Sequence, residues 1–353
     1  MYLFKMTVLR GVKSLLLCCA CASPLMDGQS GGAAKQFANP LLPSGPDPWV
    51  YTYKGFYYYM NTTGRGLTIW KTRDLAALRD AEKKVVWTPE PGKAWSKEVW
   101  APEITRWGDK WYIYFAADAG KNEGHRIFVV ENASDDPMDG QWTLKGQVGD
   151  KTDRWAIDPD VFEVGGTHYM VWSGWPGATN GEQDIYIARM SNPWTIDSPR
   201  TLISHPQFAW EKVDNRPNEA HVSVNEGPEG IVHDGKVLVV YSASGCWTDN
   251  YELGVVEASV TADLLEAKSW TKFLHPFLQQ DPKAGVYGPG HNGFFKSPDG
   301  TQDWIIYHAN GAPKEGCGGA RSPRMQPFTW NPDGTPNFGK PVASGQMLDK
   351  PSH

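Results

Sequence analysis

Three acidic residues stand where repeated segments of the chain begin, and their type suits acid–base chemistry. Asp47 lies in Gly-Pro-Asp-Pro-Trp-Val, Asp158 in Ala-Ile-Asp-Pro-Asp-Val-Phe, and Glu226 in Asn-Glu-Gly-Pro. Carboxyl groups that face one another across a small space shift each other's pKa, so that one can act as an acid while another acts as a base. A single Asp-Pro pair is an ordinary turn starter. Three acidic residues in register across repeats favour a shared site.

Four further carboxylates lie beside the same turns. They are Glu103, Asp160, Glu219 and Glu229. Acidic side chains are rarely buried unless they are paired. We therefore expect these four to be exposed, or paired with Arg and Lys, rather than to take part in the site.

Five segments that share one pattern must position the three acids. Each opens with a Pro turn and continues with a short strand, a Gly turn, an aromatic strand and a third strand. The opening pairs are Asp47-Pro48, Ala101-Pro102, Asp158-Pro159, Gly227-Pro228 and Gly288-Pro289, at intervals of 54, 57, 69 and 61 residues. The expected aromatic strands are 56–61, 111–116, 168–174, 237–244 and 304–309, and the third strands are 66–72, 125–132, 184–190, 251–259 and 324–330. These runs are rich in Val, Ile and aromatic residues, as half-buried strands are.

Helical patterns are nearly absent. Only 75–84 and 262–267 could form short helical turns, and neither carries a long apolar period. An all-β chain with five such repeats predicts a five-bladed β-propeller, with a β-sandwich carrying long loops as the alternative. The first strand of each propeller blade lines the axial channel, so the three carboxylates should converge there.

The composition agrees with a packed, turn-rich protein. The 353 residues include 17 Trp, 14 Tyr and 13 Phe, together with 37 Gly and 27 Pro. Propeller blades bury large flat side chains against one another, so most of the Trp should be core. An apolar fraction of 40% excludes a disordered chain. The net charge of −6 excludes a broad basic surface for nucleic acid.

The first 22 residues are typical of a secretory signal peptide. Lys5, Arg10 and Lys13 precede an apolar run at 14–22 that ends in Ala-Cys-Ala, and this run is too short to cross a bilayer. A disordered amphipathic N-terminus and a bacterial lipobox at Cys21 are the alternatives. We expect a secreted, extracellular protein (periplasmic or lipid-anchored if it is a bacterial lipoprotein). A flexible segment should follow at 23–38 and a single catalytic propeller domain at 39–353.

Two cysteines, Cys246 and Cys317, lie outside that N-terminal segment. In an oxidising compartment they could pair, but the sequence does not tell whether their Cα atoms are close enough. Asn61 and Asn132 each begin a match to the glycosylation pattern Asn-X-Ser/Thr. Such short patterns are common by chance.

Five short strings occur in order near the repeat starts. They are Asp47-Pro-Trp-Val, Trp100-Ala-Pro-Glu-Ile, Ala156-Ile-Asp-Pro-Asp-Val-Phe, Asn225-Glu-Gly-Pro and Gly288-Pro-Gly-His-Asn. Together they resemble glycoside hydrolase family 43, over about 39–330. The resemblance implies a five-bladed propeller and a secreted enzyme that cleaves α-L-arabinofuranosyl or β-xylosyl linkages of plant polysaccharides with inversion. It implies Asp47 as general base, Asp158 as pKa modulator and Glu226 as general acid.

Sugar recognition needs aromatic faces and polar groups near the same turns. Trp100 is the best stacking candidate, and Trp49 and Trp175 are weaker ones. The segment that begins at Cys317 is similar to the family's late stretch in which an arginine contacts sugar hydroxyls. Arg321 and Arg324 compete for that role, and we favour Arg321 over Arg324. A surface ion pair is the structural alternative.

His291 follows Gly-Pro-Gly at the start of the last repeat, so it should reach the same channel. By itself, such a histidine is a hydrogen-bonded structural residue. The resemblance implies that it helps to hold a hydrated cation, often calcium, at the propeller axis. Because Ca²⁺ takes roughly six to eight oxygens, water would supply most of its ligands, and we expect no required cofactor.

Within the family, the pattern is most similar to exo-acting α-L-arabinofuranosidases that act on arabinan or arabino-oligosaccharides. β-Xylosidases and endo-α-1,5-arabinanases share the three carboxylates and remain alternatives. A non-catalytic carbohydrate-binding propeller is an alternative from another class, and it would lack one of the carboxylates. The expected partner is a plant cell-wall polysaccharide (arabinan or arabinoxylan) or its oligosaccharides. We expect no nucleic acid, no membrane and a monomer.

Overall fold

The computed structural model describes residues 35–352. The predicted signal peptide at 1–22 lies outside the described residues, as does most of the predicted flexible segment. Strands dominate 35–352, and the helical pieces there are short 3-10 turns at Leu75–Asp80, Asn122–Gly124, Ala209–Glu211 and Ala267–Ser269. In the described part, no helix has the length and apolar character needed to span a bilayer. The expectation of an all-β fold is confirmed.

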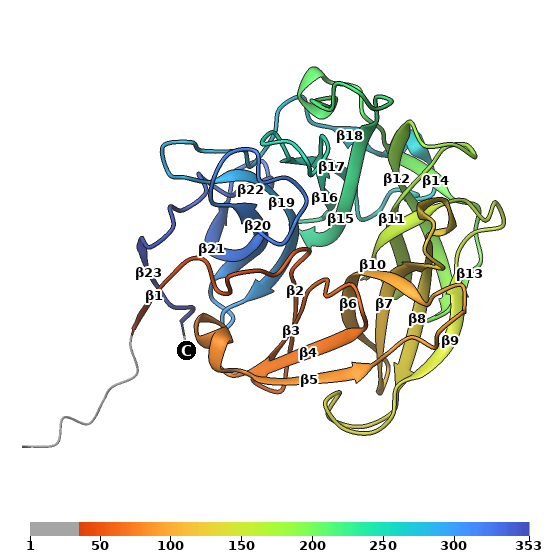
Figure 1. The fold of residues 1–353 in the computed structure, drawn as a ribbon, viewed down its shortest axis with the longest axis horizontal. Helices are drawn as coiled ribbons and strands as arrows, with labels where there is room; N and C mark the ends of the chain where they lie inside the picture. Colours follow the sequence, from red (N-terminus) through yellow and green to blue (C-terminus); the bar gives the residue numbers. More distant parts are fainter. Residues whose placement is uncertain (1–34, 353) are drawn as a thin grey trace, which may run out of the picture. The chain divides into compact units, whose positions relative to one another are not determined.

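The strands form five antiparallel units that follow one another along the chain (Figure 1). Unit one holds β2 (Trp49–Tyr53), β3 (Phe56–Met60), β4 (Leu67–Thr72) and β5 (Glu82–Trp87), and unit two holds β6 (Lys97–Trp107), β7 (Lys110–Asp118), β8 (Arg126–Asn132) and β9 (Thr143–Val148). Unit three holds β10 (Ala156–Val164), β11 (Thr167–Gly174) and β12 (Glu182–Asn192), with β13 (Thr195–Ile196) and β14 (Thr201–Ser204) both paired to β12. Unit four holds β15 (Ser223–His233), β16 (Lys236–Ala243), β17 (Glu252–Ser259) and β18 (Thr271–Lys272), and unit five holds β19 (Tyr287–Lys296), β20 (Asp303–Asn310), β21 (Ser322–Trp330) and β22 (Pro336–Asn337).

The first strands of the five units lie next to one another. β2 contacts β6, β6 contacts β10, β10 contacts β15, β15 contacts β19, and β19 contacts β2 again. Units three and four are also joined into one nine-stranded sheet by a short parallel pairing of β12 with β15. Figure 1 shows the first strands near the middle of the units, with β5, β9 and β18 further out. Residues at the starts of the first strands are thereby brought together from distant parts of the sequence.

Apolar residues fill the space between each pair of neighbouring units. Five clusters join units one and two, two and three, three and four, four and five, and five and one. Alternation along a strand explains how one strand serves two clusters. On β3, Tyr58 faces unit two, while Tyr57 and Tyr59 face unit five. Because both faces are buried, the second strands carry nearly continuous apolar runs.

The two ends of the described chain are paired. β1 (Gln36–Ala38) lies antiparallel to β23 (Met347–Asp349), with Phe37 opposite Leu348. Both side chains pack into the cluster between units five and one. The predicted boundary at residue 39 is therefore too late, because 36–38 belong to a strand. β1 has only three residues, one of them buried, so the sequence shows no alternation that would identify it as a strand.

The outer strands differ from the sequence expectations. The predicted helical turn at 75–84 is a 3-10 helix only over Leu75–Asp80, and Glu82–Trp87 is strand β5. The turn predicted at 262–267 does not form a helix, and a short 3-10 helix follows at Ala267–Ser269. β5 begins with four exposed residues, Glu-Lys-Lys-Val. A strand at a solvated edge lacks the alternation that identifies strands in sequence.

Neither glycosylation match is available in the folded chain. Asn61 is 5% exposed and Asn132 is 1% exposed. The Asn61 amide donates a hydrogen bond to the carbonyl of Thr62, and that of Asn132 donates to the carbonyl of Asp139. We therefore expect no glycosylation at either match, because both amides are used inside the structure.

Candidate active site

A bulge repeated in the first strands aims the candidate side chains. In four of the units, the register of pairing between the first and second strands shifts within a short stretch, which marks a bulge. The shifts lie between Trp100 and Glu103, Ile157 and Asp160, Glu226 and Glu229, and Gly290 and Gly293. One residue inside each shift has a positive φ: Ala101 (41°), Asp158 (54°), Gly227 (54°) and His291 (51°), and Asp47 before β2 matches them at 57°. A bulge bends its strand and redirects a side chain. Non-glycine residues in this conformation are strained and cluster at functional sites.

The bulge defines which residues are equivalent across the units. Asp47, Asp158 and His291 occupy the same position, whereas Glu226 precedes the positive-φ residue Gly227. The expectation that all three acids share one register is therefore wrong for Glu226. In the fifth unit, the residue equivalent to Asp47 and Asp158 is His291. The proline pattern would instead choose Gly288, because β19 carries two register shifts and not one. A proline-based alignment could not detect the extra residues.

A cleft of about 480 Å³ collects most of the predicted site residues. Binding sites for small ligands are usually roughly 300–1,000 Å³. Its lining includes Asp47, Trp100, Asp158, Glu226, His291 and Arg321. Other lining residues are Thr62, Glu98, Asn122, Trp155, Ile157, Asn180, Gln183, Arg216, Val222, Cys246, Trp247 and Cys317. All five units contribute, so no single repeat contains the cleft.

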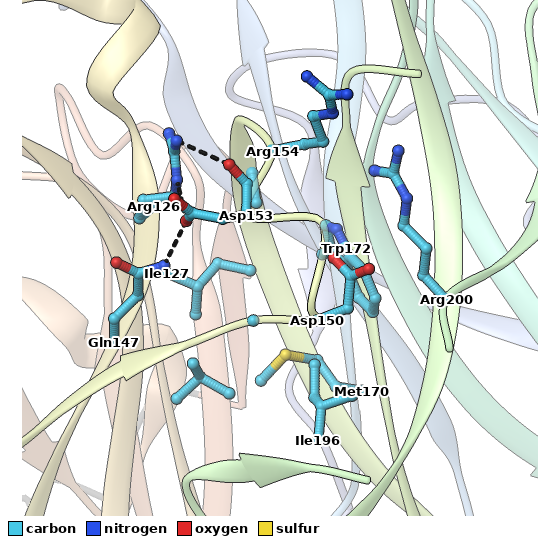
Figure 2. A pocket seen from close by; sticks show the side chains of 13 residues that line it. Arg126, Ile127, Gln147, Asp150, Asp153, Arg154, Met170, Trp172, Ile196 and Arg200 are labelled. Atoms are coloured by element: carbon cyan, nitrogen blue, oxygen red, sulfur yellow. Dashed lines mark hydrogen bonds and ion pairs between the residues drawn. The ribbon is translucent and has the colours of Figure 1, made fainter. Parts of the chain in front are cut away.

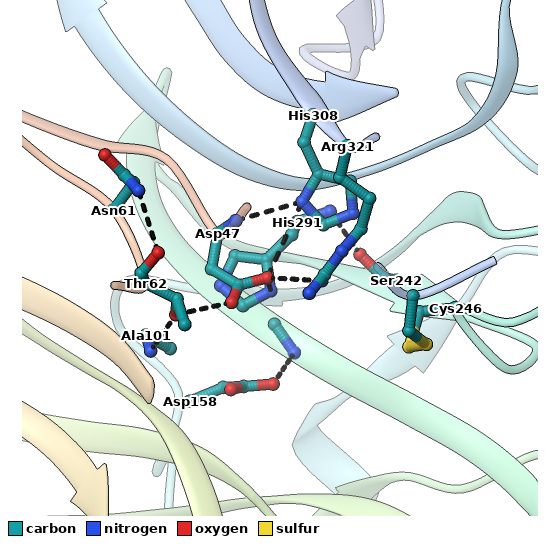
Figure 3. Close-up of polar contacts among 12 residues, drawn as sticks. Asp47, Asn61, Thr62, Ala101, Asp158, Ser242, Cys246, His291, His308 and Arg321 are labelled. Atoms are coloured by element: carbon teal, nitrogen blue, oxygen red, sulfur yellow. Dashed lines mark hydrogen bonds and ion pairs between the residues drawn. A yellow bond between two sulfur atoms is a disulfide. The ribbon is translucent and has the colours of Figure 1, made fainter. Parts of the chain in front are cut away.

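Asp47 is buried among hydrogen-bond donors (Figure 3). Its Oδ1 accepts a hydrogen bond from Arg321 Nη1 at 2.9 Å, and its Oδ2 accepts one from the Thr62 hydroxyl at 2.6 Å. His291 Nδ1 lies 3.4 Å from Oδ1. Burial alone would raise the pKa of Asp47, but the positive charge of Arg321 and the hydrogen bond from the Thr62 hydroxyl lower it below its usual range. Asp47 is therefore ionised near neutral pH.

His308 fixes the backbone of Asp47. Its Nδ1 accepts a hydrogen bond from the Asp47 backbone N–H at 3.0 Å. Burial and the charge of Arg321 lower the pKa of His308, so the ring is neutral and its proton lies on Nε2. His291, whose backbone N–H donates to Ser242 Oγ at 2.7 Å, also has its pKa lowered by burial.

Asp158 and Glu226 lie in the same cleft, but different neighbours affect the pKa of each. The Gly227 N–H donates to Asp158 Oδ2 at 3.0 Å, which favours the ionised form of Asp158. Burial and the charges of Glu226 and Asp47 raise the pKa of Asp158. Burial, with the charge of Asp47 adding to it, raises the pKa of Glu226 to about 7. A pair of carboxyls that repel each other holds a proton near neutral pH.

The two candidate arginines have different locations. Arg321 lines the cleft and contacts Asp47. Arg324 is 1% exposed on β21, where its guanidinium interacts with Tyr307. Arg321 lies in the segment before β21, whereas Arg324 lies within the strand and is not among the residues that line the cleft. Sequence alone could not choose between the two.

Among the candidate aromatic platforms, Trp100 lines the cleft, stacked 4.0 Å from the ring of His125. Trp175 does not line it: its ring is 2% exposed and stacks 5.0 Å behind Trp155. Trp49 is also outside the lining, and its indole N–H donates to the carbonyl of Ile104. The structure thus brings one of the three predicted platforms into the cleft.

Sequence reasoning missed two tryptophans of the cleft, Trp155 and Trp247. Trp155 precedes Asp158 by three residues, and Trp247 follows a cysteine of the candidate pair. Proximity to those residues was an available signal. It was hidden by the large number of core tryptophans.

Cys246 and Cys317 form a disulfide, with Cα atoms 5.1 Å apart. Both line the cleft (Figure 3 labels Cys246). The bond joins the segment after β16, which carries Trp247, to the segment before β21, which carries Arg321. It therefore links two parts of the cleft wall that come from units four and five.

Three of the four carboxylates expected to be exposed are buried instead. Glu103, Asp160 and Glu229 are at most 4% exposed, and one oxygen from each lies within 4.8 Å of the others. Burial raises the pKa of all three. Each lies two positions after the positive-φ residue of its bulge, and its side chain points into the protein interior. Glu219 is exposed and paired with Arg216, as predicted.

The buried trio is the group among residues 35–352 whose donor atoms could hold a metal ion. Its oxygens could equally share protons, since close carboxyls do so. His291 is not a member of this group. Its Nδ1 faces Asp47, and a single nitrogen suits Ca²⁺ poorly.

A small cavity lies beside unit three (Figure 2). Its volume is about 10 Å³, roughly the room that one water needs. Arg126 Nε and Gln147 Nε2 both donate to Asp153 Oδ1 at 2.8 Å. These bonds hold the segment that leads to Trp155 and the start of β10.

Comparison with known sequences identifies close relatives. A sequence model described as Glycosyl hydrolases family 43 matches residues 37–336. A Streptomyces avermitilis protein named extracellular exo-α-(1→5)-L-arabinofuranosidase is 38% identical over 88% of this chain and 64% of its own length. Alpha-L-arabinofuranosidase 43 of Humicola insolens is 34% identical over 93% of this chain and 66% of its own. The chain thus spans about two thirds of the length of these relatives.

Solved structures that are similar to this one include glycoside hydrolases as well. An α-L-arabinofuranosidase from Lactobacillus brevis superimposes with a TM-score of 0.81 and 34% identity, covering 88% of this chain and 98% of that one. A thermostable family-43 glycoside hydrolase superimposes with a TM-score of 0.75 and 26% identity, covering 90% of this chain and 99% of that one.

Proposed function

Because the chain belongs to glycosyl hydrolase family 43, we propose that it hydrolyses glycosidic bonds with inversion, releasing α-L-arabinofuranosyl units from arabinan or arabino-oligosaccharides. The observation that carries this proposal is the pairing, in one cleft, of a carboxylate held ionised with a carboxyl that keeps its proton near neutral pH. These are Asp47 and Glu226. Inverting hydrolysis needs one group of each kind.

In the proposed reaction, Asp47 takes a proton from a water molecule. The water oxygen forms a bond to the anomeric carbon from the face opposite the leaving group. As the old glycosidic bond breaks, its electron pair goes to the leaving oxygen, which receives the proton of Glu226. The products are a free sugar of inverted configuration and the shortened chain.

Asp158 is proposed as the group that orients Glu226 and keeps its pKa raised. Burial and the charges of Glu226 and Asp47 raise the pKa of Asp158, and the hydrogen bond from the Gly227 N–H at 3.0 Å opposes that rise and favours its ionised form. A negative neighbour disfavours loss of the proton from Glu226. Arg321 and Trp100 are proposed to bind the sugar ring, through hydrogen bonds and stacking respectively. Trp155 and Trp247 join them on the basis of the cleft lining.

The arabinofuranosyl preference and the exo mode are proposed from the relatives. The Streptomyces avermitilis, Humicola insolens and Lactobacillus brevis proteins are all named arabinofuranosidases, and the first is named an exo-acting one. Secretion is likewise proposed from the name of the Streptomyces protein, which includes the word extracellular. We propose that the protein acts as a monomer, because the proposed base, the proposed acid and the proposed sugar-binding residues all line one cleft.

The five units are proposed to be the blades of a five-bladed propeller. The successive contacts of the first strands and the five apolar clusters, one for each neighbouring pair of units, support this arrangement. A crystal structure in which unit five did not pack against unit one would contradict it.

No cofactor takes part in the proposed reaction. The resemblance implies a Ca²⁺ ion beside His291, whose ring offers a nitrogen donor and whose Nδ1 faces Asp47 Oδ1 at 3.4 Å. This donor set does not fit Ca²⁺. No step is therefore assigned to a metal.

The proposal is tested with Asp47→Asn and Glu226→Gln. Each should reduce hydrolysis of 4-nitrophenyl α-L-arabinofuranoside and linear arabinan to background while the melting temperature stays near that of the native protein. Glu163→Gln is the matched control, because Glu163 lies on β10 with its side chain 56% exposed. Full turnover by either variant would overturn the assignment. Faster release from a 4-nitrophenyl β-xyloside would indicate a xylosidase, mixed oligomers from arabinan an endo-enzyme, and no release at all a binding protein.

A further inference from the structure

We infer that Thr62 is a positioning residue for the general base: its hydroxyl holds one carboxylate oxygen of Asp47 and ties it to the bulge of unit two. The inference rests on the proposed function for the role of Asp47, but not for the contacts themselves. Thr62 follows β3 and lines the cleft. It lies outside the five strings that carry the family resemblance.

Three contacts surround Thr62. Its hydroxyl donates to Asp47 Oδ2 at 2.6 Å and accepts a hydrogen bond from the Ala101 N–H at 2.7 Å. Its backbone N–H donates to the carbonyl of Pro46 at 2.9 Å. Figure 3 shows Thr62 between Asp47 and Ala101. One residue therefore contacts the segment that carries Asp47 and the positive-φ residue of the neighbouring unit.

The direction of the hydroxyl hydrogen bond follows from the donor count. A threonine hydroxyl has one proton and two lone pairs. The Ala101 N–H can only donate, so it binds a lone pair of the Thr62 oxygen. The hydroxyl proton of Thr62 is then left to be donated to Asp47 Oδ2. An ionised carboxylate accepts from both sides, and Arg321 donates to Oδ1. The carboxylate plane is thereby held at both oxygens.

Thr62 acts on Asp47 together with several charged or titratable groups. They are Arg321, His291, His308, Asp158, Glu226, Tyr59 and Tyr251. The hydroxyl lowers the pKa of Asp47, in the same direction as Arg321 and opposite to burial. Loss of the hydroxyl should therefore weaken the orientation of the base and raise its pKa. A residue that merely fills space would do neither.

The test compares three variants on the full chain. Thr62→Val keeps the shape and removes the hydroxyl, while Thr62→Ser restores the hydroxyl without the methyl group. Thr63→Val is the matched control, because Thr63 is exposed and its hydroxyl donates to the Gly66 carbonyl and not to Asp47. The readouts are kcat and KM on 4-nitrophenyl α-L-arabinofuranoside, the pH dependence of kcat/KM, and the pKa of Asp47 from carboxyl ¹³C NMR. Asp47→Asn assigns the NMR signal.

Thr62→Val should lower kcat about tenfold to a hundredfold, the effect of losing a hydrogen bond to a charged group, while KM changes little. The acidic limb of the pH profile and the NMR pKa of Asp47 should both move to higher pH. Thr62→Ser should recover most of kcat, and Thr63→Val should resemble the native protein. If Thr62→Val leaves the Asp47 pKa and kcat unchanged, or if the serine variant fails like the valine variant, the inference is wrong.

The NMR measurement separates this inference from the proposed function. If the native protein releases no arabinose, the proposed function fails. A higher pKa of Asp47 in Thr62→Val would still support the positioning contact, and an unchanged one would refute it. Loss of folding in Thr62→Val alone, with native turnover in Thr62→Ser, would show that the hydroxyl is required and the methyl group is not.

Discussion

At the scale of residues, Asp47 and Glu226 are both buried but have opposite charge surroundings. Asp47 faces Arg321 and the Thr62 hydroxyl, which stabilise its ionised form. Glu226 is buried and faces the negative charge of Asp47, and both effects stabilise its protonated form. Carboxyls with separated pKa values can serve as base and acid at one pH. Placement among donors, more than residue type, determines the proposed roles.

The pH dependence of catalysis follows from these two groups. The base must be ionised, and its lowered pKa keeps it so well into the acidic range. The acid must be protonated, and its pKa is raised to about 7. We therefore expect kcat/KM to fall as the pH rises through about 7, and Asp158→Asn should move this fall to lower pH by removing a negative neighbour.

The measurement is a pH profile of kcat/KM on the aryl arabinofuranoside, with Glu163→Gln as the control for a distant acidic residue. A basic limb that stays in place in Asp158→Asn would argue against Asp158 as the group that maintains the Glu226 pKa. A profile that is flat through neutral pH would argue against Glu226 as the acid.

At the scale of elements, the bulges of the first strands orient the side chains of the candidate site, and loops supply the remaining residues of the cleft wall. The positive-φ residues precede Trp49, Glu103, Asp160 and Glu229 by two positions. This spacing explains why a second layer of carboxyls lies buried beside the cleft. The loops add Trp247 and Arg321, which the disulfide connects across units four and five.

Breaking the disulfide should affect the cleft as well as stability. The bond closes a separation of 71 residues, and native disulfides of small secreted domains typically contribute about 2–5 kcal/mol. In Cys317→Ser we expect a lower melting temperature and a lower kcat/KM, because the segment before Arg321 loses its tether. Treatment of the native protein with a reductant that breaks the bond should have the same effect. A variant that melts earlier with unchanged kcat/KM would show that the bond does not position Arg321.

At the scale of the whole described chain, a buried apolar cluster joins the last unit to the first. The cluster between units five and one includes Phe37 from β1, whose ring lies 6.2 Å from that of Trp304. Residues from the two ends of the described chain thus support the packing of units that are distant in sequence. The side chain of Phe37 is 6% exposed.

Removing the Phe37 ring should therefore destabilise the whole domain. Phe37→Ala should lower the free energy of unfolding by about 3–5 kcal/mol, the usual cost of truncating a buried aromatic residue. Leu274→Ala is the control, because Leu274 is 62% exposed. Differential scanning calorimetry of both variants gives the comparison. Equal melting temperatures for the two would mean that β1 does not contribute to the interface.

The strand pattern and most of the residues of the candidate site could be predicted from the sequence. The second and third strands of every unit lie within a few residues of their predicted positions, because both faces of the second strands are buried and their apolar runs are long. Asp47, Asp158, Glu226, Trp100, His291 and Arg321 were also identified from local motifs, and all six line the cleft. Local strings sufficed because most of these residues lie beside the repeated turns.

The tertiary structure alone decided the rest. The offset of Glu226, the burial of Glu103 and the exclusion of Arg324 depend on bulges and strand faces, which a one-residue shift changes completely. The pairing of Cys246 with Cys317 and the bridge from Thr62 to Asp47 join positions far apart along the chain. Such distances are set by how five units pack together. The sequence by itself determined which residues are available, and packing determined which of them meet.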